Sequence, residues 1–177
     1  TVLEDDPMLD VRQVPTPRQP HLVVVDSKLE TPPTARLFQA PAQGHTRKIF
    51  IYCAVPDASR QAALEQGGAT VITLPGPGGK VDLAAMLRDL AAREVNELHL
   101  EAGHKLNGSF IREGLVDEFL LYLAPQLLGV GGSGLANWGP LQSLDQRLPL
   151  RFTGVEPVGD DLRILARVQG RDHFLHA

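Results

Sequence analysis

Cysteine is nearly absent from the 177-residue sequence, which contains a single one, Cys53. One cysteine excludes an internal disulfide and a cysteine-rich zinc site. Cys53 lies in the apolar run of residues 49–54, where we interpret it as a small core residue rather than as a reactive thiol. A reduced cysteine of this kind suits a reducing cytoplasm, where we expect the protein to be found.

Long hydrophobic runs and an excess of basic residues are also missing. No apolar stretch approaches the roughly 20 residues that a membrane-spanning helix needs. The formal net charge is -4 and the basic residues form no stripe, so we expect neither a membrane nor a nucleic acid as a partner. The histidines do not have the spacing of metal ligands, and we expect no metal site.

Short apolar runs alternate with helical patterns along the chain. We predict strands over residues 21–26, 49–54, 70–74, 97–101, 118–125, 152–158 and 162–168. We predict helices over residues 59–66, 81–93 and 105–113, with Ser59 capping the first and Gly114 ending the last. This order predicts a three-layer α/β fold with a mixed, mostly parallel sheet and a C-terminal antiparallel hairpin turned at residues 159–161.

Residues 101–109 place a turn that contains glycine between a predicted strand and a predicted helix. Ligands bind at the carboxyl ends of strands in open α/β sheets, and helix N-termini offer free N–H groups to phosphates. Gly103 and Gly108 have no Cβ and allow a ligand to approach closely. Their spacing fits neither the dinucleotide-binding fingerprint nor the P-loop. A purely structural strand-to-helix turn is therefore an equal alternative.

The segment of residues 1–12 combines paired acids, a proline and an arginine. Taken alone, the acids also fit a solvated turn and Arg12 a surface charge. Further motifs follow in order: Asp26-Ser27, then Glu-Ala-Gly at 101–103, Gly-Leu-Val-Asp-Glu at 114–118 and Ala-Pro-Gln-Leu-Leu-Gly at 124–129. Together they resemble the reductase domain of the riboflavin-biosynthesis deaminase–reductases over nearly the whole chain.

The resemblance implies a fold similar to dihydrofolate reductase and NADPH as the hydride donor. The implied reaction reduces the ribosyl group of 5-amino-6-(5-phosphoribosylamino)uracil to ribityl. Leu9, Arg12 and Glu101 match positions that contact this phosphorylated pyrimidine substrate. The positions that match cofactor contacts are Thr1, Asp5, Ser27, Gly103, His104, Lys105, Leu106, Asn107, Gly108 and Ser109.

Asp5 is the candidate catalytic residue. We expect it to assist proton transfer, or to hold the nicotinamide and the substrate in register. A turn cap is the structural alternative for Asp5. Lys28 beside Ser27 either receives the phosphate that distinguishes NADPH from NADH or faces solvent. Lys105, beside the predicted helix start, either strengthens phosphate binding or faces solvent.

His104 and Trp138 are harder to interpret. His104 stands where small or neutral residues are common in the family, and we favour a cofactor-loop role over a catalytic acid. Trp138 covers the site, packs against a partner subunit or anchors its loop.

The resemblance also bears on domain content and partners. We expect a single reductase domain over residues 1–177 that lacks the family's N-terminal strand, which would precede Thr1. The His-x-Glu and Pro-Cys-x-x-Cys signature of a zinc deaminase is missing, so a fused deaminase domain would lie outside this chain. A homodimer is implied through the strand at 118–125 and the closing hairpin. The alternatives are a related reductase with another substrate and a non-catalytic cofactor-binding or oligomerisation module. The matched substrate positions Leu9, Arg12 and Glu101 argue against the first alternative. The presence of Asp5, Arg12 and Glu101 argues against the second.

Overall fold

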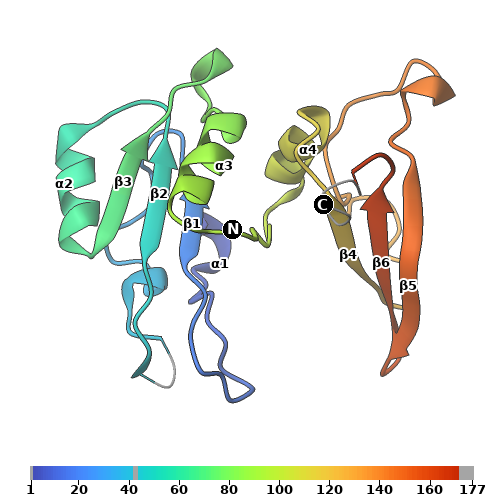
Figure 1. Cartoon of the computed structure of the whole chain (residues 1–177), viewed down its shortest axis with the longest axis horizontal. Helices are drawn as coiled ribbons and strands as arrows, with labels where there is room; N and C mark the ends of the chain where they lie inside the picture. The colour runs from blue at the N-terminus through green and yellow to red at the C-terminus, as the bar shows by residue number, and fades with distance from the viewer. Residues whose placement is uncertain (1, 42–43, 172–177) are drawn as a thin grey trace. The chain divides into compact units, whose positions relative to one another are not determined.

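The structure is a computed structural model that describes residues 2–41 and 44–171. Its internal contacts divide the chain into two compact units, Thr1–His99 and Leu100–Ala177, which we call the first and the second unit. Each unit is built on its own three-stranded sheet (Figure 1). Within the described residues, no helix is long and apolar enough to cross a membrane.

The first unit contains a parallel sheet with the strand order β1-β2-β3. Its strands are β1 (Leu22–Val25), β2 (Ile49–Cys53) and β3 (Ala69–Thr73), close to the predicted ranges. Leu22 pairs with Ile49, and Ile49 pairs with Ala69 on its other side. Every residue of the central strand β2 is buried, as expected for a parallel strand that is covered on both faces.

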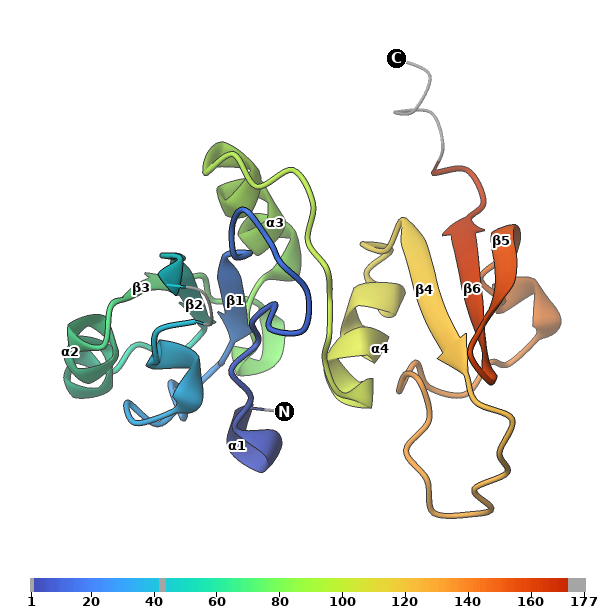
Figure 2. The ribbon, with the colours of Figure 1, turned by 90° about the horizontal axis from the view of Figure 1, so that it is seen from below.

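Helical layers cover both faces of this sheet (Figure 2). On one face, Val24 and Ile51 share a core cluster with Leu37 of η1 (Arg36–Phe38) and Leu64 of α2 (Ala58–Gln66). On the other face, the Tyr52 hydroxyl donates to Asp89 of α3 (Leu83–Ala92) at 2.6 Å. The predicted three-layer α/β arrangement is therefore confirmed.

The ends of α2 show one correction. Its N-cap is Asp57 and not Ser59, because the Asp57 carboxylate accepts hydrogen bonds from the N–H groups of Ser59 and Arg60. Gly67 and Gly68 end the helix, and Gly68 has a left-handed φ of 92° that suits glycine. A short helical turn, η3 (Pro77–Gly79), follows β3 in the predicted loop.

The second unit contains α4 (His104–Arg112) and an antiparallel sheet with the order β4-β6-β5. Its strands are β4 (Glu118–Leu123), β5 (Leu150–Val158) and β6 (Asp161–Val168), and a short η4 (Leu144–Gln146) precedes β5. The β5–β6 pair is the predicted closing hairpin. Gly159 turns it with a φ of 62°, and Gly114 ends α4 as predicted with a φ of 65°.

The strand predicted over residues 97–101 is not formed. Among the described residues, the two sheets consist of β1-β2-β3 and β4-β6-β5, and residues 97–101 belong to neither. Alternating apolar residues predict a strand, but a strand also needs a neighbour for its backbone groups. The parallel and antiparallel strands expected for a mixed sheet are present and are distributed over two sheets.

Candidate functional site

The predicted site residues fall into both units. Asp5, Leu9, Arg12 and Ser27 belong to the first unit, and residues 101–109 belong to the second. Thr1 lies outside the described residues. The structure therefore shows how each unit holds its own group of candidate residues.

The paired acids end a short helix, α1 (Val2–Asp5). Asp6 follows with a left-handed φ of 41°, and its carboxylate accepts the N–H of Arg36 at 2.8 Å. The acid that fixes this turn is thus Asp6. Asp5 is exposed, so its carboxylate is accessible to a ligand.

Arg12 borders a small hollow in the first unit. Its side chain is 62% exposed and forms an ion pair with Asp10 at 3.2 Å. Residues 10–14 line a cavity of ≈ 330 Å³ at this point. Leu9 has a left-handed φ of 50° and packs partly buried against the core. The guanidinium of Arg12 can therefore offer donors to a phosphate or a carbonyl group.

Asp26 fixes the loop that carries Ser27. Its carboxylate accepts the N–H groups of Lys28 at 3.3 Å, Glu30 at 2.9 Å and Thr31 at 2.7 Å, and also the Thr31 hydroxyl at 2.7 Å. These bonds turn the chain sharply after β1. Ser27 and Lys28 are thereby held at the carboxyl end of that strand, where open α/β sheets bind ligands.

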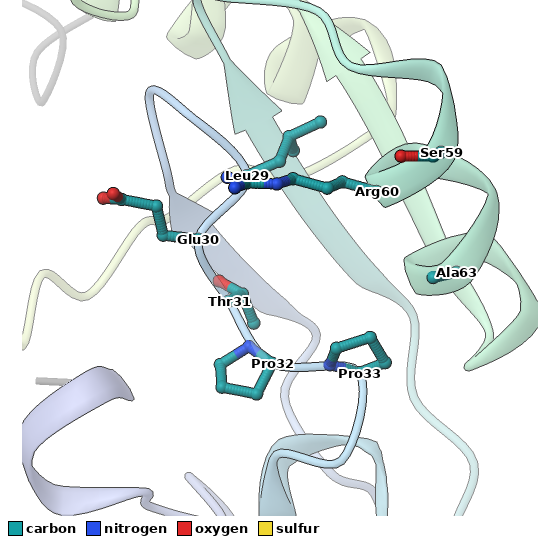
Figure 3. A pocket seen from close by; sticks show the side chains of 8 residues that line it. All are labelled: Leu29, Glu30, Thr31, Pro32, Pro33, Ser59, Arg60 and Ala63. Atoms are coloured by element: carbon teal, nitrogen blue, oxygen red, sulfur yellow. The ribbon is translucent and has the colours of Figure 1, made fainter.

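A second cavity, of ≈ 510 Å³, lies between this loop and α2 (Figure 3). Arg60 extends from α2 towards the loop, and its Nη1 donates to the Lys28 carbonyl at 3.0 Å. The Ser27 carbonyl accepts the N–H groups of Ala54 at 3.1 Å and Val55 at 2.9 Å. The lining residues are Leu29, Glu30, Thr31, Pro32, Pro33, Ser59, Arg60 and Ala63.

In the second unit, the N-terminus of α4 is open. Gly103 is the N-cap and forms no side-chain cap hydrogen bond. Its carbonyl accepts the N–H groups of Leu106 at 3.1 Å and Asn107 at 3.2 Å, which begins the helix. A Cβ built on Gly103 would meet nothing within 4 Å. The first N–H groups of α4 are thus free of a side-chain cap and fit a phosphate group.

Gly108 has a different reason to be glycine. A Cβ at this position would collide with the main chain of Asn137. The Asn137 N–H donates to the His104 carbonyl at 2.7 Å, and the Asn107 amide donates to the Leu135 carbonyl at 3.0 Å. We predicted close approach of a ligand at Gly108, but here the loop of residues 129–140 occupies that space. Gly108 therefore serves the packing of this loop against α4.

The other candidates of the second unit lie around the start of α4. His104 is its first residue, Lys105 is exposed, and the Ser109 hydroxyl donates to the Lys105 carbonyl at 3.2 Å. Glu101 is exposed, and residues 95–100, directly before it, form no strand. Trp138 is half-buried in its loop.

Several polar residues that hold the site segments were not singled out from the sequence. They are Gln19, Arg47 and Arg60, and Asp26 was noted only as part of a motif. An acid followed by a tight turn is a known turn pattern, so the role of Asp26 could have been found. Isolated residues such as Arg47 have no such pattern, because a lone charge usually faces solvent.

Comparison with known proteins gives a consistent result. The RibD C-terminal domain family matches residues 1–164. The chain is 32% identical over 167 residues to the riboflavin biosynthesis protein RibD of Aquifex aeolicus, which covers 93% of this chain and 43% of that protein. It is 24% identical over 177 residues to the 5-amino-6-(5-phosphoribosylamino)uracil reductase of Buchnera aphidicola, covering 93% of this chain and 81% of that protein.

A solved structure shows the same fold. RibD of Acinetobacter baumannii has a TM-score of 0.78 at 24% identity, and the match covers 96% of this chain and 45% of that one. The chain thus spans less than half the length of the RibD proteins that it matches. The predicted dihydrofolate reductase-like fold class is confirmed by this likeness. Because the family match extends over almost all of the sequence, the chain belongs to the RibD C-terminal domain family.

Proposed function

We propose that this chain is the reductase part of a riboflavin-biosynthesis enzyme. It reduces the ribosyl group of 5-amino-6-(5-phosphoribosylamino)uracil to ribityl, with NADPH as the hydride donor. The observation that carries the proposal is the open N-terminus of α4 directly after the Glu-Ala-Gly motif of residues 101–103. The reductase name of the Buchnera aphidicola relative supports the reaction class.

The described residues fit a nicotinamide cofactor. NADPH supplies the hydride when it is bound. The N–H groups at the start of α4 and the exposed Lys105 bind its phosphates. Ser27 and Lys28, in the loop that Asp26 fixes, bind the additional phosphate that distinguishes NADPH from NADH.

The remaining candidates act on the substrate. Arg12 donates to the phosphate or to a pyrimidine carbonyl, and Leu9 and Glu101 complete the substrate contacts. Reduction of the ribosyl group also requires a proton. The exposed carboxyl group of Asp5 holds that proton or keeps the substrate aligned with the nicotinamide.

We also propose two partners. One is a deaminase domain in the same protein, because the RibD relatives are more than twice as long as the matched region. The other is a second copy of the chain. The strand register places Leu123, Phe152, Val155 and Leu162 on one side of the second unit's sheet, and each is at least 40% exposed. We call these four residues the apolar face, which a homodimer would cover.

A direct assay tests the function. The full-length protein is mixed with NADPH and the deaminated pyrimidine, and both the nicotinamide absorbance and the ribityl product are followed. We expect oxidation of NADPH and slower oxidation of NADH. Absence of oxidation would reject the proposal. Binding of NADPH without turnover would favour a non-catalytic module, and turnover of another carbonyl compound alone would favour a related reductase.

The role of Asp5 has its own variant. Asp5→Asn should lower kcat by about 100-fold, since a positioned acid or base contributes on that order, and should leave the melting temperature unchanged. Asp160→Asn is the matched control, because Asp160 is an exposed acid in the hairpin turn of the second unit. An unchanged kcat in Asp5→Asn would remove Asp5 from the mechanism.

A further inference from the structure

Arg47, just before β2, binds the main chain of the segment that precedes Arg12. Its Nη1 donates to the Leu9 carbonyl at 2.8 Å, and its Nη2 donates to the Met8 carbonyl at 2.7 Å. The same Nη2 donates to the Leu37 carbonyl at 2.9 Å. One guanidinium therefore joins two consecutive carbonyl groups of this segment to η1.

Gln19 holds Val11, two residues further along the same segment. The Val11 N–H donates to Gln19 Oε1 at 2.8 Å, and Gln19 Nε2 donates to the Val11 carbonyl at 2.8 Å. Gln19 is only 3% exposed, so these bonds are shielded from water. Two polar side chains thus fix the main chain from Met8 to Val11.

The conformation of the segment requires such support. Leu9 has a φ of 50°, which lies in the left-handed region that residues other than glycine rarely adopt. Conformations of this kind persist where the surrounding structure fixes them, and they are frequent at functional sites. Hydrogen bonds to the carbonyl groups of Met8 and Leu9 fix the peptide planes on both sides of Leu9.

Charge connects the same residues to Arg12. Asp10, whose side chain is 1% exposed, forms an ion pair with Arg12 at 3.2 Å. Burial lowers the pKa of Arg47, and the charge of Asp10 partly opposes that change. An arginine stays protonated at neutral pH, so Arg47 keeps its donors. The charges of both Arg12 and Arg47 therefore act on Asp10.

We propose that Arg47, together with Gln19, is a positioning residue for the substrate. It holds Leu9 in its left-handed conformation and so directs Arg12 into the cavity of residues 10–14. This inference rests on the proposed function, because that function makes Leu9 and Arg12 substrate contacts. The Ser27 loop of the cofactor site has separate supports in Asp26 and Arg60.

The first test compares the effect on substrate binding with the effect on cofactor binding. In the full-length protein, Arg47→Met should raise KM for the pyrimidine about 10-fold or more, because a displacement of about 1 Å weakens binding and alignment strongly. The Kd of NADPH, measured by fluorescence, should change less than about two-fold, since the cofactor loops keep their bonds. Arg47→Lys should recover part of the loss, because an ammonium group reaches fewer acceptors than a planar guanidinium does.

Arg93→Met is the matched control. Arg93 is on the opposite face of the same sheet, where it binds Asp89 at 2.7 Å and lies over the Phe50 ring. Its replacement removes an arginine with structural contacts and should leave KM for the pyrimidine unchanged. An equal rise of KM in both variants would assign the effect of Arg47 to general stability and overturn the inference.

A measurement without ligand tests the role of Arg47 independently of catalytic activity. Hydrogen exchange at the Val11 amide should become at least about 10-fold faster in Arg47→Met, because the segment loses the two hydrogen bonds of Arg47 and Gln19 alone then holds it. Unchanged exchange would overturn the positioning role of Arg47. Should Arg47→Met fail to fold, Gln19→Met tests the same segment by the same comparison of KM with that of the unsubstituted protein. Absence of turnover in the unsubstituted protein would reject the proposed function. If that protein is active and the variant has the same KM for the pyrimidine, only the positioning role is rejected.

Discussion

The parallel sheet of the first unit and the antiparallel sheet of the second bury their apolar residues to different extents. Of the twenty buried hydrophobic residues in the described chain, seventeen lie in the first unit and three in the second. Of the seventeen exposed large hydrophobic residues, fourteen lie in the second unit. The first unit therefore has a core of its own, whereas the sheet of the second unit exposes many of its apolar side chains.

The two units also hold their candidate residues differently. In the first unit, the side chains of Arg47, Gln19 and Asp26 bind the main chain of the segments that carry Leu9, Arg12 and Ser27. In the second unit, a neighbouring loop binds α4 through main-chain groups such as those of Asn137. The difference indicates that substitutions of single polar side chains will disturb the site segments of the first unit most.

The largest expected effect compares a buried leucine of the first unit with an exposed leucine of the second. Leu37→Ala should lower the free energy of unfolding by about 2–5 kcal/mol, because Leu37 is fully buried in η1 and its loss leaves a cavity. Leu144→Ala in η4 is the matched control, and with Leu144 78% exposed we expect a change below about 0.5 kcal/mol. Urea unfolding measures both variants. Equal losses would contradict the difference in burial.

A smaller effect is expected where α4 meets its loop. Gly108→Ala should destabilise the second unit by about 1–3 kcal/mol, because the added Cβ collides with the Asn137 main chain. Gly134→Ala is the control, since a Cβ at that position meets nothing within 4 Å. Hydrogen exchange at the α4 amides reports on the second unit alone. A stable Gly108→Ala protein with unchanged exchange would show that the loop does not pack against the helix in this way.

The elements of both units could be predicted from the sequence where local pattern decides them. Neighbouring residues alone predict three features: the apolar run of β2, the glycine that ends α4 and the closing hairpin. The segment of residues 97–101 has alternating apolar residues but forms no strand, because strand formation also depends on pairing, which no local pattern contains. The N-cap at Asp57 was missed because Ser59 is also a good capping residue.

The candidate site was predictable in a similar way. Motifs over residues 1–12 and 101–109 identified the segments, but they did not reveal what holds them. Arg47 is 38 residues away from Leu9 in the sequence, so no spacing rule connects the two. At Gly108 we expected the close approach of a ligand, and only the fold shows that the Asn137 main chain approaches there instead.

The two tyrosines give a matched test of intermediate size. Tyr52→Phe should cost about 1.5 kcal/mol, because it removes a hydrogen bond to the carboxylate of Asp89. Tyr122→Phe should change little, since Tyr122 is 57% exposed on β4. Equal effects of the two substitutions at neutral pH would contradict the difference between a buried and an exposed hydroxyl.

The same pair predicts a pH dependence. Burial, and then the hydrogen bond to Asp89, raise the pKa of Tyr52 above its ordinary value. The folded state thus favours the neutral phenol. The stabilising effect is complete below the unfolded tyrosine pKa of about 10 and is lost as the pH rises above it. The difference in stability between the unsubstituted protein and Tyr52→Phe should therefore shrink in urea unfolding at about pH 10.5 compared with pH 7. A constant difference would contradict this coupling.

The smallest effect on the chain itself is expected at the apolar face. Phe152→Ser should change the stability of an isolated subunit by less than about 0.5 kcal/mol, because Phe152 is 68% exposed. In a homodimer that covers this face, the same substitution should weaken association by at least about 10-fold, as loss of a central aromatic residue does. Sedimentation equilibrium over a range of concentrations measures the dimer, with Leu127→Ser as the control, because Leu127 is exposed outside the strands. If the unsubstituted protein is monomeric throughout, or if Phe152→Ser dimerises as well as Leu127→Ser, the apolar face is not a subunit interface. A loss of dimer confined to Phe152→Ser would instead explain why the sheet of the second unit exposes hydrophobic residues, whereas the first unit buries its own.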